Sequence, residues 1–493
     1  MPAKLSNRNL KKTFAIHGFL CLAAIILLYL VIGGISPAML RHRAIAEALL
    51  AGQNWGRQAL VGSLEYPPLP TLLLLIFDGP LKILSLDGAR LLCAVAQVFC
   101  ISRMLRLLQT FGRRGEMLII FLLPLSMVIF WRDAFLFTSA DPGWVTAAVY
   151  VGFFCSLSRW QHKQDLRHLV SASFMLGLLT LCGIGGILLA LLSLPVALHG
   201  IKRITANEEK FRGLPTLMGL PVIYCLALLL LWNWLVMDDT LFFARDFWAR
   251  ASSLHLSSFG NAAHKYLLFF YLLAVMVLLI VSFFSDQSLS AHLLLPAFIV
   301  IPLVFLLCRN MQVHPAGAGA MSGMALVLFF LLYSYSNFNT VLSGILAGGG
   351  TLALAICGFA AFFEHKSPFL DVQAEIPERE QLVAYIDQFW PDSRIMLYGL
   401  PLACSYPDPL EKRFVARLDY QEADFLRQAA DEQMHLLLPP PDGRFYAPGK
   451  TVFSDIYMSG RSWLLLEQQY PDGWQLWRCV IAPEGESKLD ILR

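Results

Sequence analysis

Residues 214–236 read LPTLMGLPVIYCLALLLLWNWLV, an apolar run without a charged side chain. A membrane-spanning helix needs about 20 such residues, because its backbone polar groups must be satisfied within the segment itself. Comparable runs lie at roughly 14–35, 88–108, 116–131, 143–158, 168–182, 184–200, 265–284, 290–308, 317–336 and 339–363. The sequence therefore predicts an α-helical polytopic membrane protein with about eleven transmembrane helices.

The C-terminal part of the chain differs in composition from the rest. Over 493 residues the chain is 57% hydrophobic and 15% charged, whereas soluble domains average about 45–50% and about 25%. The apolar excess ends near residue 363, so we expect a transmembrane domain over 1–363 and a small soluble α/β domain over 364–493 that folds as its own unit. Its expected elements are helices at 377–390 and 420–433, strands at 393–399 and 434–438, and a hairpin of 463–470 and 474–481 around Pro471-Asp472-Gly473.

Charge and cysteine usage exclude several classes of function. The net charge is +3 and no Lys/Arg-rich run occurs, so nucleic acid is not an expected partner. Most of the ten cysteines lie in apolar segments, and no CxxC or Cys/His cluster appears, so no metal site is expected. Cys404 and Cys479 lie in the soluble part, where a disulfide and two free thiols are both open alternatives.

The apolar stretch 67–86 decides the topology. It carries Asp78, Gly79, Pro80 and Lys82 in its second half. If it lies in the membrane interface, the three basic loops near residues 103–114, 159–167 and 202–212 all face the cytoplasm, as the positive-inside rule requires. If it crosses, all three move outside. We therefore predict an interfacial stretch, an outside loop over 36–87, and a C-terminal domain that also faces outside.

The first outside loop holds the most informative residues. Residues 38–51 (AMLRHRAIAEALLA) have the pattern of an amphipathic helix, and Gly52 is a suitable C-terminal cap. Glu65-Tyr66-Pro67-Pro68-Leu69-Pro70 follows, and consecutive prolines restrict the backbone to an extended corner before the next helix. A carboxylate just before such a rigid corner can be held in one orientation at the membrane surface.

The order of these features resembles the GT-C glycosyltransferases, multi-spanning enzymes that include protein O-mannosyltransferases and aminoarabinose transferases. The resemblance covers most of the chain. It runs from a signal-anchor helix through the loop helix with its Gly, the Tyr-Pro-Pro-Leu helix entry, Gly88-Ala89-Arg90-Leu91, a basic cytoplasmic loop and Asp141-Pro142 to a late Arg309 and His314-Pro315 before the soluble tail.

This resemblance implies transfer of a sugar from a polyprenyl-phosphate carrier to an acceptor at the outer face. A carboxylate acts as general base in such enzymes, and cations bind the lipid phosphate. Glu65 and Asp141 are the candidate bases. The candidates for contacts with the lipid phosphate or substrate are Arg309, His314, Arg41, Arg43 and Tyr66. The implied setting is a bacterial inner membrane, with a periplasmic tail, membrane lipids and envelope assembly proteins as partners, and with no cofactor or divalent metal.

The chain departs from the family at one important place. The family has an Asp about fourteen residues before the Gly that ends the first loop helix, whereas this chain has Ser36-Pro37-Ala38-Met39. Asp141 also fits a helix N-cap, Glu65 an ion pair with a loop arginine, and Arg309 a snorkelling cation. A catalytically silent subunit of a polysaccharide assembly system is therefore one alternative function. A lipid or sugar transporter is another.

Overall fold

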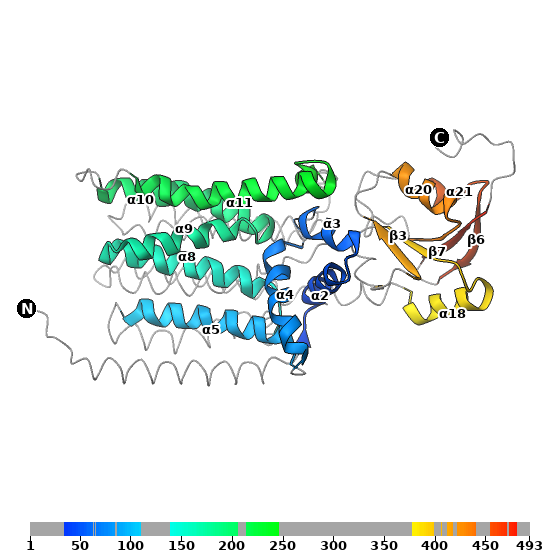
Figure 1. The fold of residues 1–493 in the computed structure, drawn as a ribbon, viewed down its shortest axis with the longest axis horizontal. Helices are drawn as coiled ribbons and strands as arrows, with labels where there is room; N and C mark the ends of the chain where they lie inside the picture. Colours follow the sequence, from blue (N-terminus) through cyan, green and yellow to red (C-terminus); the bar gives the residue numbers. More distant parts are fainter. Residues whose placement is uncertain are drawn as a thin grey trace, which may run out of the picture.

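The computed structural model describes residues 34–62, 64, 66–83, 86–109, 139–205, 213–245, 377–398, 406, 412–417, 422–439, 454–470 and 473–480. A bundle of long helices forms one end of the molecule, and a sheet with its helices forms the other (Figure 1). The bundle contains α5 (Gly88–Gln109), α8 (Gly143–Lys163), α9 (Leu166–Leu179), α10 (Gly183–Thr205) and α11 (Leu214–Met237). These helices match the runs predicted at 88–108, 143–158, 168–182, 184–200 and 214–236.

The bundle has a buried centre and an apolar outer surface. Helix α8 packs against both α5 and α9, and Trp144, Tyr150 and Phe153 on it are fully buried. On the outside of α11, Leu220 is 60% exposed and Ile223 65%. Large apolar side chains gathered on one outer face are unfavourable in water and suit contact with lipid tails. These helices therefore have the surface of a membrane protein.

Two of the described helices are long and apolar enough to cross a membrane: Gly183–Lys202 within α10, and α11. Shorter apolar helices occur at Pro68–Asp78, Gly88–Cys100 and Leu166–Leu179. The expected span at 143–158 lies in the described helix α8, which is not among these apolar helices. The expected spans at 14–35, 116–131, 265–284, 290–308, 317–336 and 339–363 lie wholly or almost wholly outside the described residues. The total of about eleven transmembrane helices therefore stays a prediction.

Three helices of the first loop lie between the bundle and the sheet (Figure 1). They are α2 (Pro37–Leu50), α3 (Asn54–Gly62) and α4 (Pro68–Ile83). Helix α2 ends as predicted, with Gly52 at φ +76° just beyond it. Helix α4 begins at the proline corner and runs across the end of the bundle, not along it (Figure 1). The interfacial placement of 67–86 stays a prediction.

Close backbone contacts hold the first loop on the bundle. The Leu69 amide donates to the Leu181 carbonyl at 3.1 Å, so the start of α4 is tied to the turn between α9 and α10. Gly183 in that turn has φ +83°, and a Cβ there would lie 2.8 Å from the Leu64 carbonyl oxygen. Only glycine tolerates both conditions.

The C-terminal region is the expected α/β unit, with a five-stranded sheet. The strands are β3 (Ile395–Tyr398), β4 (Phe414–Arg417), β5 (His435–Leu438), β6 (Leu464–Gln469) and β7 (Gln475–Cys479), in the order β4-β3-β5-β7-β6. β3 is parallel to β4 and β5, whereas β7 is antiparallel to β5 and β6. The helices are α18 (Arg379–Phe389), α20 (Glu422–Asp431) and α21 (Ser454–Ser459). The sequence predicted these elements except β4 and α21.

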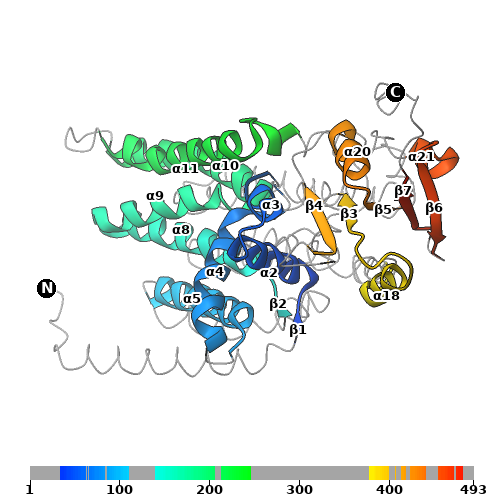
Figure 2. The same ribbon diagram turned by 45° about the vertical axis from the view of Figure 1, so that its right-hand side comes forward.

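The two faces of this sheet are covered differently. One face packs on α20 and α21, through residues such as Phe425 and Ile456. The other packs on α18 and also on α2 and α3 of the first loop. Its core joins Ile395 and Phe414 to Ile45 and Trp55. The first loop and the C-terminal region therefore share one hydrophobic core, and Figure 2 shows α2 and α3 on the β4 side of the sheet.

Candidate functional site

Asp141 lies buried where the bundle meets the first loop. Its side chain is carried by the residues that join β2 (Ser139–Ala140) to α8, and the residue is 1% exposed. Oδ1 accepts a hydrogen bond from the Gly143 amide at 2.8 Å, so the carboxylate caps the first turn of α8 as predicted. Oδ2 is also buried and has no hydrogen-bond partner among the described residues. A buried carboxylate oxygen without a partner is costly, so it is a candidate for a functional role.

Ser36 lies beside Asp141 and two residues before Ala38, where the resemblance implies a carboxylate. β1 (Gly34–Ile35) pairs in parallel with β2, and the Ser36 amide donates to the Ala140 carbonyl at 3.0 Å. The Ser36 hydroxyl accepts from the Met39 amide at 3.2 Å and caps α2. The segment that follows is buried, with Met39 0% exposed. Asp141 is thus a buried carboxylate close to the start of α2.

Arg41 and Tyr66 form a pair across the loop. The Arg41 guanidinium donates to the Tyr66 hydroxyl and lies 5.8 Å from the centre of its ring. Tyr66 is 3% exposed and belongs to the core shared with the C-terminal sheet. The phenol therefore supports a cation of α2 and is itself shielded from solvent.

His42 lies in the interior between α2 and α4, not on the exposed face of α2. Its ring is fully buried, Nδ1 is 2.7 Å from the Thr71 hydroxyl, and the ring meets Tyr66 edge-on at 5.8 Å. Burial lowers the pKa of His42 from 6.5 to about 3, so the ring is neutral at physiological pH. This side chain helps to hold α2 against α4 and adds no positive charge to the loop.

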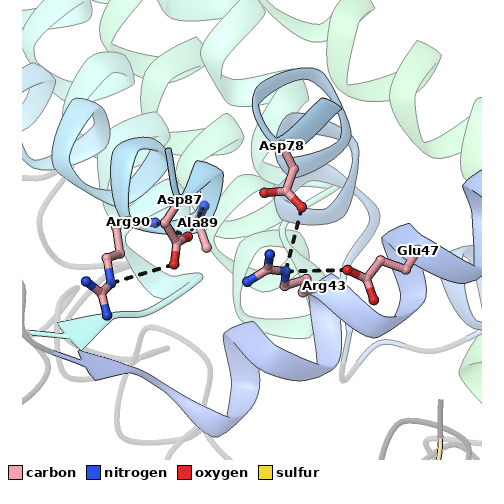
Figure 3. Close-up of polar contacts among 6 residues, drawn as sticks. All are labelled: Arg43, Glu47, Asp78, Asp87, Ala89 and Arg90. Atoms are coloured by element: carbon pink, nitrogen blue, oxygen red, sulfur yellow. Dashed lines mark hydrogen bonds and ion pairs between the residues drawn. The ribbon is translucent and has the colours of Figure 1, made fainter. Parts of the chain in front are cut away.

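Arg43 lies between two carboxylates (Figure 3). Its Nε is 3.5 Å from Glu47 Oε1 on the same helix and 3.7 Å from Asp78 Oδ2 on α4. The Asp78 side chain is only 6% exposed. Sequence reasoning left Asp78 out of the site. The available signal was the cost of a carboxylate in an apolar segment, which requires a cationic or hydrogen-bonding partner.

The start of α5 lies next to this group. Asp87 Oδ1 accepts from the amides of Ala89 at 3.0 Å and Arg90 at 3.3 Å, and Asp87 Oδ2 is 3.6 Å from Arg90 Nε (Figure 3). The Gly-Ala-Arg-Leu motif is therefore a capped helix start. A Cβ on Gly88 would lie 2.7 Å from Asp78 Oδ1, so the helix start presses directly on Asp78.

The structure places only some of the predicted site residues. Arg41, Arg43, Tyr66 and Asp141 are described, and they lie on or beside the first loop. Glu65, Arg309 and His314 are outside the described residues. Within the described ranges, no group of three or more His, Cys, Asp or Glu side chains could hold a metal ion.

The resemblance of the chain to known proteins is structural. No protein-family model and no curated protein matches it. The crystal structure of ArnT from Cupriavidus metallidurans bound to undecaprenyl phosphate matches over 94% of this chain and 99% of that one, at 14% sequence identity and a TM-score of 0.44. Its apo crystal structure matches over 95% and 100%, at 15% identity and 0.42. The chain is similar to ArnT.

Proposed function

We propose that the chain is a GT-C-type membrane glycosyltransferase that transfers a sugar from a polyprenyl-phosphate carrier to an envelope acceptor. The acceptor is a lipid, a polysaccharide or a protein at the periplasmic face of a bacterial inner membrane. The observation that carries the proposal is the buried Asp141, whose Oδ2 has no hydrogen-bond partner among the described residues. It lies at the same end of the bundle as the arginines of α2.

The chemistry follows from this arrangement. A base on the acceptor must reach its hydroxyl or amine proton within hydrogen-bond distance. Asp141 Oδ2 takes that proton while the acceptor atom bonds to the anomeric carbon. The bond from that carbon to the phosphate oxygen breaks, and the phosphate leaves with the electron pair. Cations then stabilise the charge that gathers on the phosphate.

The cations that would bind the phosphate come from two distant parts of the sequence. Arg41 and Arg43 on α2, with Arg309 and His314 later in the sequence, would bind the phosphate. Glu65 is the second candidate base. The lipid-linked sugar is the donor, and no further cofactor or divalent metal is proposed. The C-terminal domain, on the periplasmic side, would contact the acceptor or an envelope assembly protein.

Sugar transfer by the purified full chain in lipid nanodiscs tests this function, with radiolabelled polyprenyl-phosphate sugars as donors. Asp141→Asn should lower turnover by about a hundredfold to ten-thousandfold, since a general base contributes that much. Asn caps helices about as well as Asp, so thermal stability should change little. Equal turnover in parent and variant would remove Asp141 as the base, and Glu65→Gln would then be the variant to measure.

A second candidate is a catalytically silent member of the same fold. The observation that favours it is the buried Ala38-Met39 pair, which stands where the resemblance implies a carboxylate. Such a subunit would bind polyprenyl phosphate without transferring sugar. A parent protein that binds the lipid but transfers nothing from any polyprenyl-phosphate sugar would support this candidate over the enzyme.

A further inference from the structure

The guanidinium of Arg43 contacts its two carboxylate partners through Nε alone. Its Nε faces both Glu47 and Asp78, and Figure 3 shows both contacts starting from Nε, with one terminal nitrogen on the side of Asp78 and the other on the side opposite Glu47. Within the described part of the chain, no hydrogen bond or ion pair involves these terminal nitrogens. The Arg43 side chain is 30% exposed, so a ligand can reach it. A guanidinium anchored at Nε presents its terminal nitrogens as a planar pair of donors.

Asp78 is the more rigid of the two anchors. It is 4% exposed on α4, whereas the Glu47 side chain is 43% exposed on α2, the helix that carries Arg43 itself. The start of α5 restricts it further, since a Cβ on Gly88 would lie 2.7 Å from both Cα and Oδ1 of Asp78. Removing a partner from a buried charge is strongly unfavourable, so Asp78 and Arg43 constrain each other.

We propose that Asp78 is a positioning residue, which turns Arg43 so that its terminal nitrogens grip the phosphate of a polyprenyl-phosphate lipid. This inference rests on the proposed function and names the cation and its support. Two parallel N–H···O bonds from one guanidinium are the favoured way to hold a phosphate. Asp78 on α4 holds the Arg43 guanidinium through Nε, and the two terminal nitrogens stay accessible to the phosphate.

An ion pair that merely joins α2 to α4 would look the same in the structure, so the test needs a phosphate-specific readout. Binding of polyprenyl phosphate and of polyprenol is measured side by side on the full chain in nanodiscs. Arg43→Ala and Asp78→Asn should each weaken polyprenyl phosphate binding by roughly 10- to 100-fold, as expected for charged hydrogen bonds. Binding of polyprenol, which lacks the phosphate, should stay unchanged.

Three further variants sharpen the comparison. The double variant should bind polyprenyl phosphate no more weakly than Arg43→Ala alone, because Asp78 acts only through Arg43. Glu47→Gln is the matched control, since Glu47 contacts the same Nε from an exposed position; it should lose less than about threefold. Asp78→Glu should restore part of the loss by keeping the charge.

The outcomes separate this inference from the proposed function. Asp78→Asn that binds polyprenyl phosphate as tightly as the parent overturns the inference alone. A loss of polyprenol binding equal to the loss of polyprenyl phosphate binding also overturns it, because it reveals a structural role. A parent that binds polyprenyl phosphate through Arg43 but transfers no sugar leaves the inference standing and rejects the enzyme. A parent that does not distinguish the two lipids rejects both.

Discussion

The two faces of the C-terminal sheet are built from different parts of the chain. One face packs Met396 and Val415 against α20 and α21, so the C-terminal region covers it with its own helices. The opposite face packs Ile395 and Leu397 against α18 and against α2 and α3, which lie more than three hundred residues earlier in the sequence. The C-terminal region covers this second face only in part, with α18, and depends on the first loop for the rest of that core.

The sheet face that α18, α2 and α3 cover, called the shared face below, also contributes to the candidate site. Tyr66 belongs to the same hydrophobic core, and its hydroxyl accepts a hydrogen bond from Arg41. Ile45 on α2 lies in that core two residues after Arg43. The arginine-bearing helix is thus held by the C-terminal sheet on one side and by the bundle on the other, where Met39 and Ala46 pack. Its position depends on both.

The largest expected effect is on the isolated C-terminal region. A fragment of residues 364–493 would expose the sheet face that α2 and α3 cover, and each large apolar side chain left in water costs about 1.5–3 kcal/mol. Several such side chains together rival a typical domain stability of about 5–15 kcal/mol. We expect no cooperative thermal unfolding of the fragment by circular dichroism. A sharp unfolding transition would instead support the independent unit expected from composition.

Composition and local sequence pattern could predict individual helices and strands. They could not predict the packing of the first loop on the C-terminal sheet. Long apolar runs indicated α5 and α8 to α11, because a bilayer requires them. The hairpin followed from Pro471-Asp472-Gly473, and Gly473 has φ +86°. The strand β4 reads Phe-Val-Ala-Arg, and only its first two residues favour strands, so the sequence did not predict it. Contacts between the first loop and the tail are non-local, and a single sequence carries no pattern that pairs them.

The candidate site shows the same limit. Asp141 was predicted as a helix cap because Asp-Pro before an apolar run is a local signal, and the structure has the cap. The pair of Arg43 and Asp78 joins two helices, so neither residue revealed the other. Burial of His42 likewise depends on α4, since Thr71 is its partner. The roles of Glu65, Arg309 and His314 stay predictions.

A matched pair of substitutions compares the two faces directly. Ile45 and Ile456 are both fully buried, one on the shared face and one on the face covered by α21. Ile→Ala at either site should cost about 2–5 kcal/mol. Hydrogen exchange should differ: Ile45→Ala should speed exchange in α2 and in β3 with β4, whereas Ile456→Ala should leave α2 protected. Equal protection of α2 in both variants would contradict a shared core.

Tyr66→Phe tests the link from the shared face to the site. The ring stays in the core, but Arg41 loses its hydroxyl partner, and a hydrogen bond to a charged group is worth about 1.5–3 kcal/mol. We expect polyprenyl phosphate binding to weaken by about tenfold, with the junction intact by hydrogen exchange. Tyr385→Phe is the control, because Tyr385 packs on the same face and its hydroxyl bonds to Glu467. Equal effects of the two variants would rule out a specific link.

The smallest expected effect is a dependence of stability on pH. His435 in β5 is 1% exposed, its Nδ1 is 2.7 Å from the Ser393 hydroxyl, and burial lowers its pKa from 6.5 to about 4. It is two residues from Leu437 on the same strand, so its ring lies on the shared face. Between pH 6.5 and pH 4 the unfolded chain binds a proton that the folded chain does not.

Stability on the shared face should therefore fall as the pH drops below about 6.5, by at most about 1.4 kcal/mol per pH unit from this histidine. The pKa of His42, lowered to about 3, acts in the same direction. Thermal unfolding of the full chain at pH 7 and pH 5.5 measures the loss, and His435→Gln should reduce the difference between the two pH values. Among the described residues, His42 and His435 are the buried histidines, and neither lies on the other face. As the pH falls, protection against hydrogen exchange should therefore be lost in α2 and β3 before it is lost in α20. Earlier loss of protection in α20 would show that the acid-sensitive core lies on the opposite face of the sheet.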